Sequence, residues 1–132
     1  MGKTTTATEI WVTTTNETGA LTKLTASLAE AKVNIYGFCG WTEGTEAKFR
    51  FLTDNNDKTL ELWNTAGYTT TTSEVVVTEL EDKPGTTWNT AQTLSNAGIS
   101  VNYMYVTTCG DCPITRAVFN CDNNTKAAEL LG

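Results

Sequence analysis

Apolar residues near the start of the chain recur first at strand spacing and then at helix spacing. Residues 9–15 (EIWVTTT) have the composition and alternation of a strand. The next apolar residues recur every three or four positions and form one stripe: Leu21, Leu24, Leu28 and Ala31. This pattern predicts a strand followed by an amphipathic helix.

The same alternation of strand and helix spacing continues to residue 73. Residues 32–41 (KVNIYGFCGW) and 47–53 (AKFRFLT) are predicted to be strands joined by a turn. Asp57 is expected to cap a second helix, which ends at Gly67, and residues 68–74 (YTTTTSE) supply one more strand. The predicted order is strand, helix, strand, strand, helix, strand.

The pattern is then repeated. Gly19 and Gly85 stand 66 residues apart, each just before a helical stretch. The same offset aligns four apolar pairs: Leu28 with Leu94, Ala31 with Ala97, Val33 with Ile99, and Ile35 with Val101. Later, DNNDK and DNNTK match at an offset of 68, so the second copy has two extra residues, which fall in a CGDC turn. Self-similarity of this kind indicates two copies of one supersecondary unit.

The second copy predicts the same elements without the last strand. Its first strand is EVVVTEL, its first helix carries Trp88, Ala91 and Leu94, and its final helix ends at Gly132. The fold expected is α+β, with two tandem ferredoxin-like βαββαβ modules over residues 9–73 and 74–132, antiparallel sheets and helices on one face. The missing strand leaves a sheet edge that residues from Tyr68 onward or a partner chain would cover, so a homodimer is expected.

Composition and charge narrow the function. The chain has 9 basic and 15 acidic residues and no Lys/Arg cluster, which argues against a nucleic-acid or anionic-membrane surface. No apolar run approaches the roughly 20 residues of a membrane span, and a cytoplasmic location is the default expectation. There is no His for general base catalysis and no glycine elbow around a serine, so we expect neither an enzyme nor a cofactor.

The loops NETGAL and EDKPG, together with the stretches VNIYGF and ISVNYMY, resemble ACT domains of the tandem, free-standing kind. The resemblance covers residues 9–131. It implies a regulatory module that binds a small ligand, typically an amino acid, where two ACT modules meet.

The resemblance also implies site residues. Serine-binding ACT modules of phosphoglycerate dehydrogenases use one Asn before the loop glycine and another after the helix, positions that Asn16 and Asn34 occupy here. A primary amide both donates and accepts hydrogen bonds, and open N–H groups at a helix start suit a carboxylate. The candidate ligand-binding set is Asn16, Glu17, Thr18, Gly19, Ala20, Leu21, Asn34, Asp82 and Gly85.

Alternatives remain open at these positions. In the second copy Asp82 replaces the first Asn and Ser100 the second, so a second identical site is in doubt. Asn16 and Asn34 can also serve only the turn and the strand in which they lie. A structural or assembly module that binds no ligand is the rival hypothesis.

Cysteines suggest a third possibility. Cys109 and Cys112 have the spacing of a redox pair or of half a zinc site, but no His is present, and Cys39 and Cys121 fall in predicted strands. A plain turn is therefore favoured over a metal or redox site, and no metal is expected.

Overall fold

The computed structural model describes residues 3–107 and 110–132. The elements in chain order are β1 (Thr4–Thr15), α1 (Ala20–Glu30), β2 (Ile35–Glu43), β3 (Glu46–Thr53), α2 (Asn56–Thr65), β4 (Thr69–Glu81), α3 (Thr86–Asn96), β5 (Val101–Thr107), β6 (Ile114–Cys121) and α4 (Asn124–Leu131). The chain divides into two compact units. We call residues 8–73 module 1, and residues 74–132 with residues 1–7 module 2.

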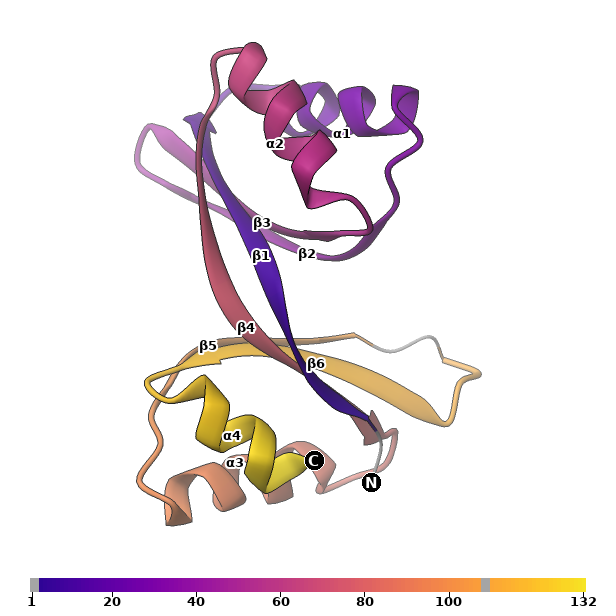
Figure 1. The fold of residues 1–132 in the computed structure, drawn as a ribbon, viewed down its shortest axis with the longest axis vertical. Helices are drawn as coiled ribbons and strands as arrows, with labels where there is room; N and C mark the ends of the chain where they lie inside the picture. The colour runs from indigo at the N-terminus through magenta and orange to yellow at the C-terminus, as the bar shows by residue number, and fades with distance from the viewer. Residues whose placement is uncertain (1–2, 108–109) are drawn as a thin grey trace. The chain divides into compact units, whose positions relative to one another are not determined.

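Each module is a four-stranded antiparallel sheet with two helices on one face (Figure 1). The hydrogen-bonded strand order along the chain is β2-β3-β1-β4-β6-β5. Module 1 uses β2-β3-β1-β4 and module 2 uses β1-β4-β6-β5, because β1 and β4 each contribute residues to both modules. The predicted α+β fold of tandem ferredoxin-like modules is confirmed. Among the described residues, no helix has both the length and the apolar character of a membrane span.

Two strands are longer than the sequence pattern predicts. The predicted last strand of the first copy and first strand of the second are one continuous strand, β4. β1 begins at Thr4, five residues before the predicted start, and its first residues lie beside β4 in module 2. There the N–H of Glu79 donates to the carbonyl of Lys3 at 2.8 Å, and the hydroxyls of Thr4 and Thr78 lie 2.6 Å apart.

The start of β1 therefore covers the edge of β4 that was expected to need a strand from Tyr68 onward or from a partner chain. That expectation was wrong, because a threonine-rich segment outside the repeat forms the missing strand. Thr favours strands even where no apolar alternation marks them. The open-edge argument for a homodimer no longer holds.

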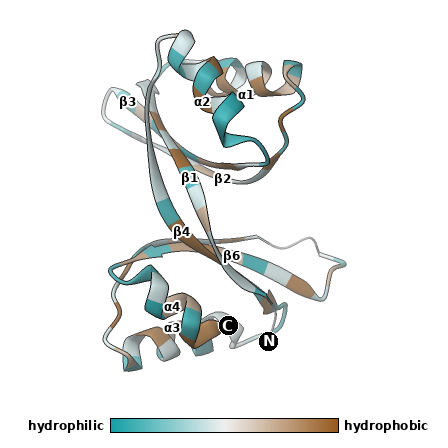
Figure 2. Cartoon of the chain, viewed as in Figure 1, coloured by the Kyte–Doolittle hydropathy of each residue, from teal (hydrophilic) through white to brown (hydrophobic). Residues whose placement is uncertain are grey.

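Each module has its own apolar core between sheet and helices. In module 1 the ring of Trp63 packs edge-on against Phe51 at 5.1 Å, and Leu24 and Leu28 from α1 are fully buried. The core of module 2 contains Val76, Leu94, Ile99, Phe119, Cys121, Ala127 and Leu131. In Figure 2 the helices carry both hydrophobic and hydrophilic segments, as amphipathic helices must.

Two helix predictions need correction. The cap of α2 is Asn55, whose side chain accepts from the N–H of Lys58 at 3.1 Å, while Asp57 lies in the first turn. In α3 the buried residues are Thr90 and Leu94, whereas Trp88 is 66% exposed. The buried face of α3 therefore contains Thr90 and Leu94, and Trp88 lies on its solvent-exposed face.

The two copies share their backbone details. Gly19 and Gly85 both have φ of 89° and stand at the N-cap of α1 and α3. Asn55 and Asn123 cap α2 and α4 with φ of −150° and the same side-chain hydrogen bond. β2 and β5 carry their register shifts at matching places, Ile35/Gly37 and Val101/Tyr103. The repeat inferred from residue spacing is thus a repeat of conformation.

Candidate functional site

The loop between β1 and α1 leaves backbone donors open. Gly19 adopts the left-handed conformation that a side chain would strain, and no side chain caps the helix. The N–H of Ala20 donates to Glu17 at 3.2 Å and that of Lys23 to Gly19 at 3.0 Å. The N–H groups of Leu21 and Thr22, between them, have no acceptor among the described residues. These donors lie at the positive end of the helix dipole, which favours an anion.

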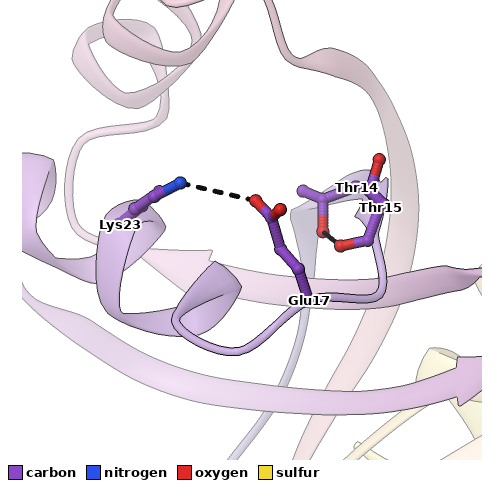
Figure 3. A network of polar contacts seen from close by, with 4 residues as sticks. All are labelled: Thr14, Thr15, Glu17 and Lys23. Carbon is purple, nitrogen blue, oxygen red and sulfur yellow. Dashed lines mark hydrogen bonds and ion pairs between the residues drawn. The ribbon is translucent and has the colours of Figure 1, made fainter.

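Glu17 lies exposed in this loop and is directed toward α1 (Figure 3). Its carboxylate is 3.4 Å from the ammonium of Lys23, and both side chains are more than half exposed. An exposed ion pair of this kind contributes only about 0–1 kcal/mol to stability. The Glu17 carboxylate is therefore available to a ligand at small cost to the fold.

A polar groove of about 770 Å³ adjoins the loop within module 1. It is lined by Thr13, Thr14, Thr15, Glu17, Thr45, Glu46, Lys48, Gly67, Tyr68 and Thr69. The lining combines hydroxyls with an ammonium and two carboxylates. Glu17 is the one predicted site residue among them, and it joins the loop to the groove.

The structure separates the two predicted amides within module 1. The N–H of Asn16 donates to Thr45, just before β3, and the N–H of Asn34 donates to the carboxylate of Asp54, just after β3. At about 3.3 Å per residue, the eight residues of β3 place these ends roughly 23 Å apart. One amino acid cannot contact both amides of the same module.

The side-chain amides of both residues nevertheless make no hydrogen bond within the described part of the fold. Asn16 and Asn34 are exposed, and neither side chain has a hydrogen-bond partner among the described residues. Of the other predicted contacts, Thr18 and Leu21 are exposed, whereas the side chain of Ala20 is buried in module 1, so that only its backbone faces the loop.

The matching loop of module 2 keeps the geometry and changes the chemistry. Gly85 has the conformation of Gly19, and the N–H of Asn89 donates to Gly85 at 2.9 Å, as Lys23 does to Gly19. Asp82 is exposed, and its N–H donates to Pro113 at 2.9 Å. Module 2 thus presents a carboxylate where module 1 presents an amide.

Sequence reasoning missed a stack on the helix-free face of module 1. The guanidinium of Arg50 lies over the rings of Trp11 and Trp41, 4.0 and 4.7 Å from their centroids. The sequence contained a signal for this stack, because strand alternation places these three residues on the face of the sheet opposite Phe49 and Phe51. The indole N–H of Trp41 donates to Glu43 at 2.9 Å and, more than the nearby Lys48, lowers the pKa of that carboxyl.

The cysteines divide into two groups. Cys39 and Cys121 are free thiols in β2 and β6, as predicted, and burial is the main cause that raises the pKa of each. Cys112 is disulfide-bonded. Cys109 lies outside the described residues, so the proposed pair is not described as a unit. Among the described residues no group of three or more potential ligands is placed to hold a metal ion.

Comparison with solved structures places this fold among known ones. Protein BT0572 from Bacteroides thetaiotaomicron superposes with a TM-score of 0.90 at 22% identity, covering 97% of this chain and 88% of that one. The regulatory subunit of aspartate kinase from Thermus thermophilus gives a TM-score of 0.71 at 11% identity, covering 99% and 95%. Aspartokinase alpha and beta subunits give 0.67 at 15% identity, covering 98% and 94%.

Comparison of the sequence with known families and proteins gives one clear result. No curated protein matches the chain. The model of the ACT domain pair matches residues 5–131, which include both modules and most of the β1 segment that the repeat did not reveal. The chain therefore belongs to the ACT domain pair family.

Proposed function

We propose that this protein is a regulatory module that binds an amino acid at the Asn16–Leu21 loop of module 1. The observation that carries the proposal is the uncapped start of α1, where the N–H groups of Leu21 and Thr22 have no acceptor among the described residues. A ligand carboxylate satisfies such donors and gains from the helix dipole. Gly19 leaves room for its approach, since nothing lies within 4 Å of the point where a Cβ would stand.

The groove beside the loop suits the rest of the ligand. Glu17 offers a carboxylate to the ligand ammonium, and the threonine hydroxyls of the groove donate to or accept from a polar side chain. These features favour a small polar or aliphatic amino acid over a large aromatic one. The Thermus thermophilus neighbour is a regulatory subunit of aspartate kinase, which agrees with a binding role rather than a catalytic one.

A second copy of the chain supplies Asn34 in this proposal. Within one module the β3 strand keeps Asn34 away from the loop, so a homodimer that places the start of β2 of one chain beside the loop of the other completes the site. The loop of module 2 has Asp82 and Ser100 at the corresponding positions and is not a second identical site.

The test is a thermal-shift panel of the twenty amino acids with the full chain. Ligand at a hundred times its dissociation constant stabilises the fold by about 2.7 kcal/mol, which raises Tm by several degrees. Asn34→Ala should abolish the rise and leave the unliganded Tm nearly unchanged, because its side chain bonds to no described residue. Ser100→Ala, the matched change in module 2, should leave the rise intact.

Three outcomes count against the proposal. If no amino acid shifts Tm at millimolar concentration, the site is absent and the assembly role becomes the better account. If Asn34→Ala unfolds the protein, Asn34 is a structural residue. If light scattering shows that the protein is a monomer, and the Asn34→Ala variant binds ligand as tightly as the unaltered chain, the loop binds the ligand alone and the proposal of a shared site is wrong.

A further inference from the structure

Module 2 contains a small cavity, partly open to solvent, beside α3. The cavity has a volume of about 180 Å³ and lies between α3, the end of β4 and the end of α4. It is lined by Glu79, Leu80, Glu81, Lys83, Thr86, Asn89, Thr90, Thr93 and Leu131. All of these residues belong to module 2, and the cavity is separate from the groove described above.

Two side-chain differences between the copies fall in the lining of the cavity. Leu131 stands where module 1 has Trp63, and Thr90 stands where module 1 has Leu24. All four side chains are buried, and the members of each pair align at the offsets of the repeat, 66 and 68 residues. Both Leu131 and Thr90 line the cavity, and each is smaller than the residue aligned with it in module 1.

The polar wall of the cavity offers acceptors. The hydroxyls of Thr86, Thr90 and Thr93 donate to the carbonyls of Lys83, Thr86 and Asn89 at 3.1, 3.1 and 2.9 Å. Each hydroxyl has one proton, so its oxygen retains only acceptor capacity. A molecule that bonds to these hydroxyls must therefore bring a hydrogen-bond donor, while Leu80 and Leu131 supply an apolar surface.

Module 1 shows the interaction that this wall can make. There the indole N–H of Trp63 donates to the hydroxyl of Ser27 at 3.0 Å and to the carbonyl of Leu24 at 3.2 Å. Ser27 itself donates to the carbonyl of Leu24 at 2.8 Å, as Thr93 does to its own helix. Thr93 occupies the Ser27 position of module 2, where Leu131 has no N–H to offer.

We propose that module 2 binds a small aromatic molecule with a ring N–H or O–H donor, of the indole or phenol class, in this cavity. The volume is adequate, since an apolar cavity of about 150 Å³ holds benzene. The ligand ring lies against Leu80 and Leu131, and its donor reaches the Thr93 hydroxyl. This site does not depend on the amino-acid site proposed for module 1.

The probe is indole itself, titrated into the ¹⁵N-labelled full chain and followed by amide chemical shifts. We expect saturable shifts at Thr90, Thr93 and Leu131 and none at the matched positions Leu24, Ser27 and Trp63. Indene has the same shape without the N–H. One neutral hydrogen bond of about 1 kcal/mol predicts that indole binds about five-fold more tightly than indene.

Two variants locate the ligand. Thr93→Val removes the acceptor and keeps the shape, so it should make indole and indene bind equally. Leu131→Trp restores the module 1 residue and should abolish binding of both. If that variant does not fold, Thr90→Leu, which also restores a module 1 residue, takes its place. Ser27→Ala is the control and should leave indole affinity in module 2 unchanged.

The proposal is overturned if indole causes no saturable shift at millimolar concentration, or if the shifts cluster around another surface such as exposed Trp88. Equal binding of indole and indene to the unaltered chain overturns the donor requirement and with it the ligand class. Persistent binding in the folded cavity-filling variant shows that the molecule lies elsewhere and has the same consequence.

Discussion

Replacing Trp63 by Leu gives module 1 the residue that module 2 has at the same place, so it tests how far the two cores differ. Trp63 is 1% exposed and donates its N–H to Leu24 and Ser27. The replacement keeps an apolar side chain in the core but removes the ring, the donor and the edge contact with Phe51. Trp88→Leu is the matched control, because Trp88 is 66% exposed.

The magnitude follows from these contacts. Replacing a buried Trp by Ala costs about 3–5 kcal/mol, and Leu retains part of the buried surface, which leaves about 2 kcal/mol for lost packing. The lost hydrogen bonds add about 1 kcal/mol, and the lost edge-on ring pair adds about 0.5–1 kcal/mol. We expect Trp63→Leu to lower the free energy of unfolding by about 3–4 kcal/mol, and Trp88→Leu to change it by less than about 0.5 kcal/mol.

Urea unfolding followed by far-UV circular dichroism measures both values, with amide hydrogen exchange to show which module opens. Exchange should accelerate in module 1, and added indole should restore part of the lost stability by occupying the new space. A loss below about 1 kcal/mol for Trp63→Leu, or equal losses for the two variants, would show that the Trp63 contacts do not hold module 1 together.

Two further predictions concern the backbone. Gly19→Ala and Gly85→Ala should each lower the free energy of unfolding by about 1–2 kcal/mol, because both residues have φ of 89°. The two losses should add in the double variant. Urea unfolding measures them, and unequal losses would contradict the shared loop geometry. Removing residues 1–7 exposes the edge of β4 in module 2. We therefore expect concentration-dependent association in light scattering and faster hydrogen exchange of the β4 amides. A stable monomer with protected β4 amides would refute this prediction.

The helices and the repeat could be predicted from the sequence because their determinants are local. Glycines before the helices and apolar spacing act within a few residues, and each occurs twice at a near-constant offset. The Asn caps occur twice as well, but the cap of α2 was expected at Asp57 instead of Asn55. Strand alternation likewise puts Phe49 and Phe51 on one face of β3, and both are buried.

The early start of β1 could not be predicted in this way. Residues 4–8 (TTTAT) show no alternation of apolar and polar residues, and their strand conformation depends on pairing with β4, more than sixty residues away. The separation of Asn16 and Asn34 has a similar cause. The sequence locates Asn16 after the first strand and Asn34 near the start of the second. Whether these two points lie close together depends on the order of strands in the sheet, which places β3 between β1 and β2.

The two copies allow folding requirements to be told apart from other uses of a residue. Features that both modules need, such as Gly19 with Gly85 and Asn55 with Asn123, are the same in each copy and have the same conformation. A position where the backbone is the same and the side chain differs is not dictated by the fold. Asn34 and Ser100 are such a pair, since the N–H of each donates to a matching aspartate, Asp54 at 2.9 Å and Asp122 at 3.2 Å.

The positions that carry the two proposals belong to this second kind. Asn16 faces solvent in one copy and Asp82 in the other on loops of equal geometry, and Leu131 lines the cavity at the position where module 1 has the larger Trp63. The cavity of about 180 Å³ beside Leu131 has a lining in which two side chains, Leu131 and Thr90, differ from their module 1 counterparts Trp63 and Leu24. Because the shared backbone does not require these differences, the asymmetry between the modules is where function should be sought first.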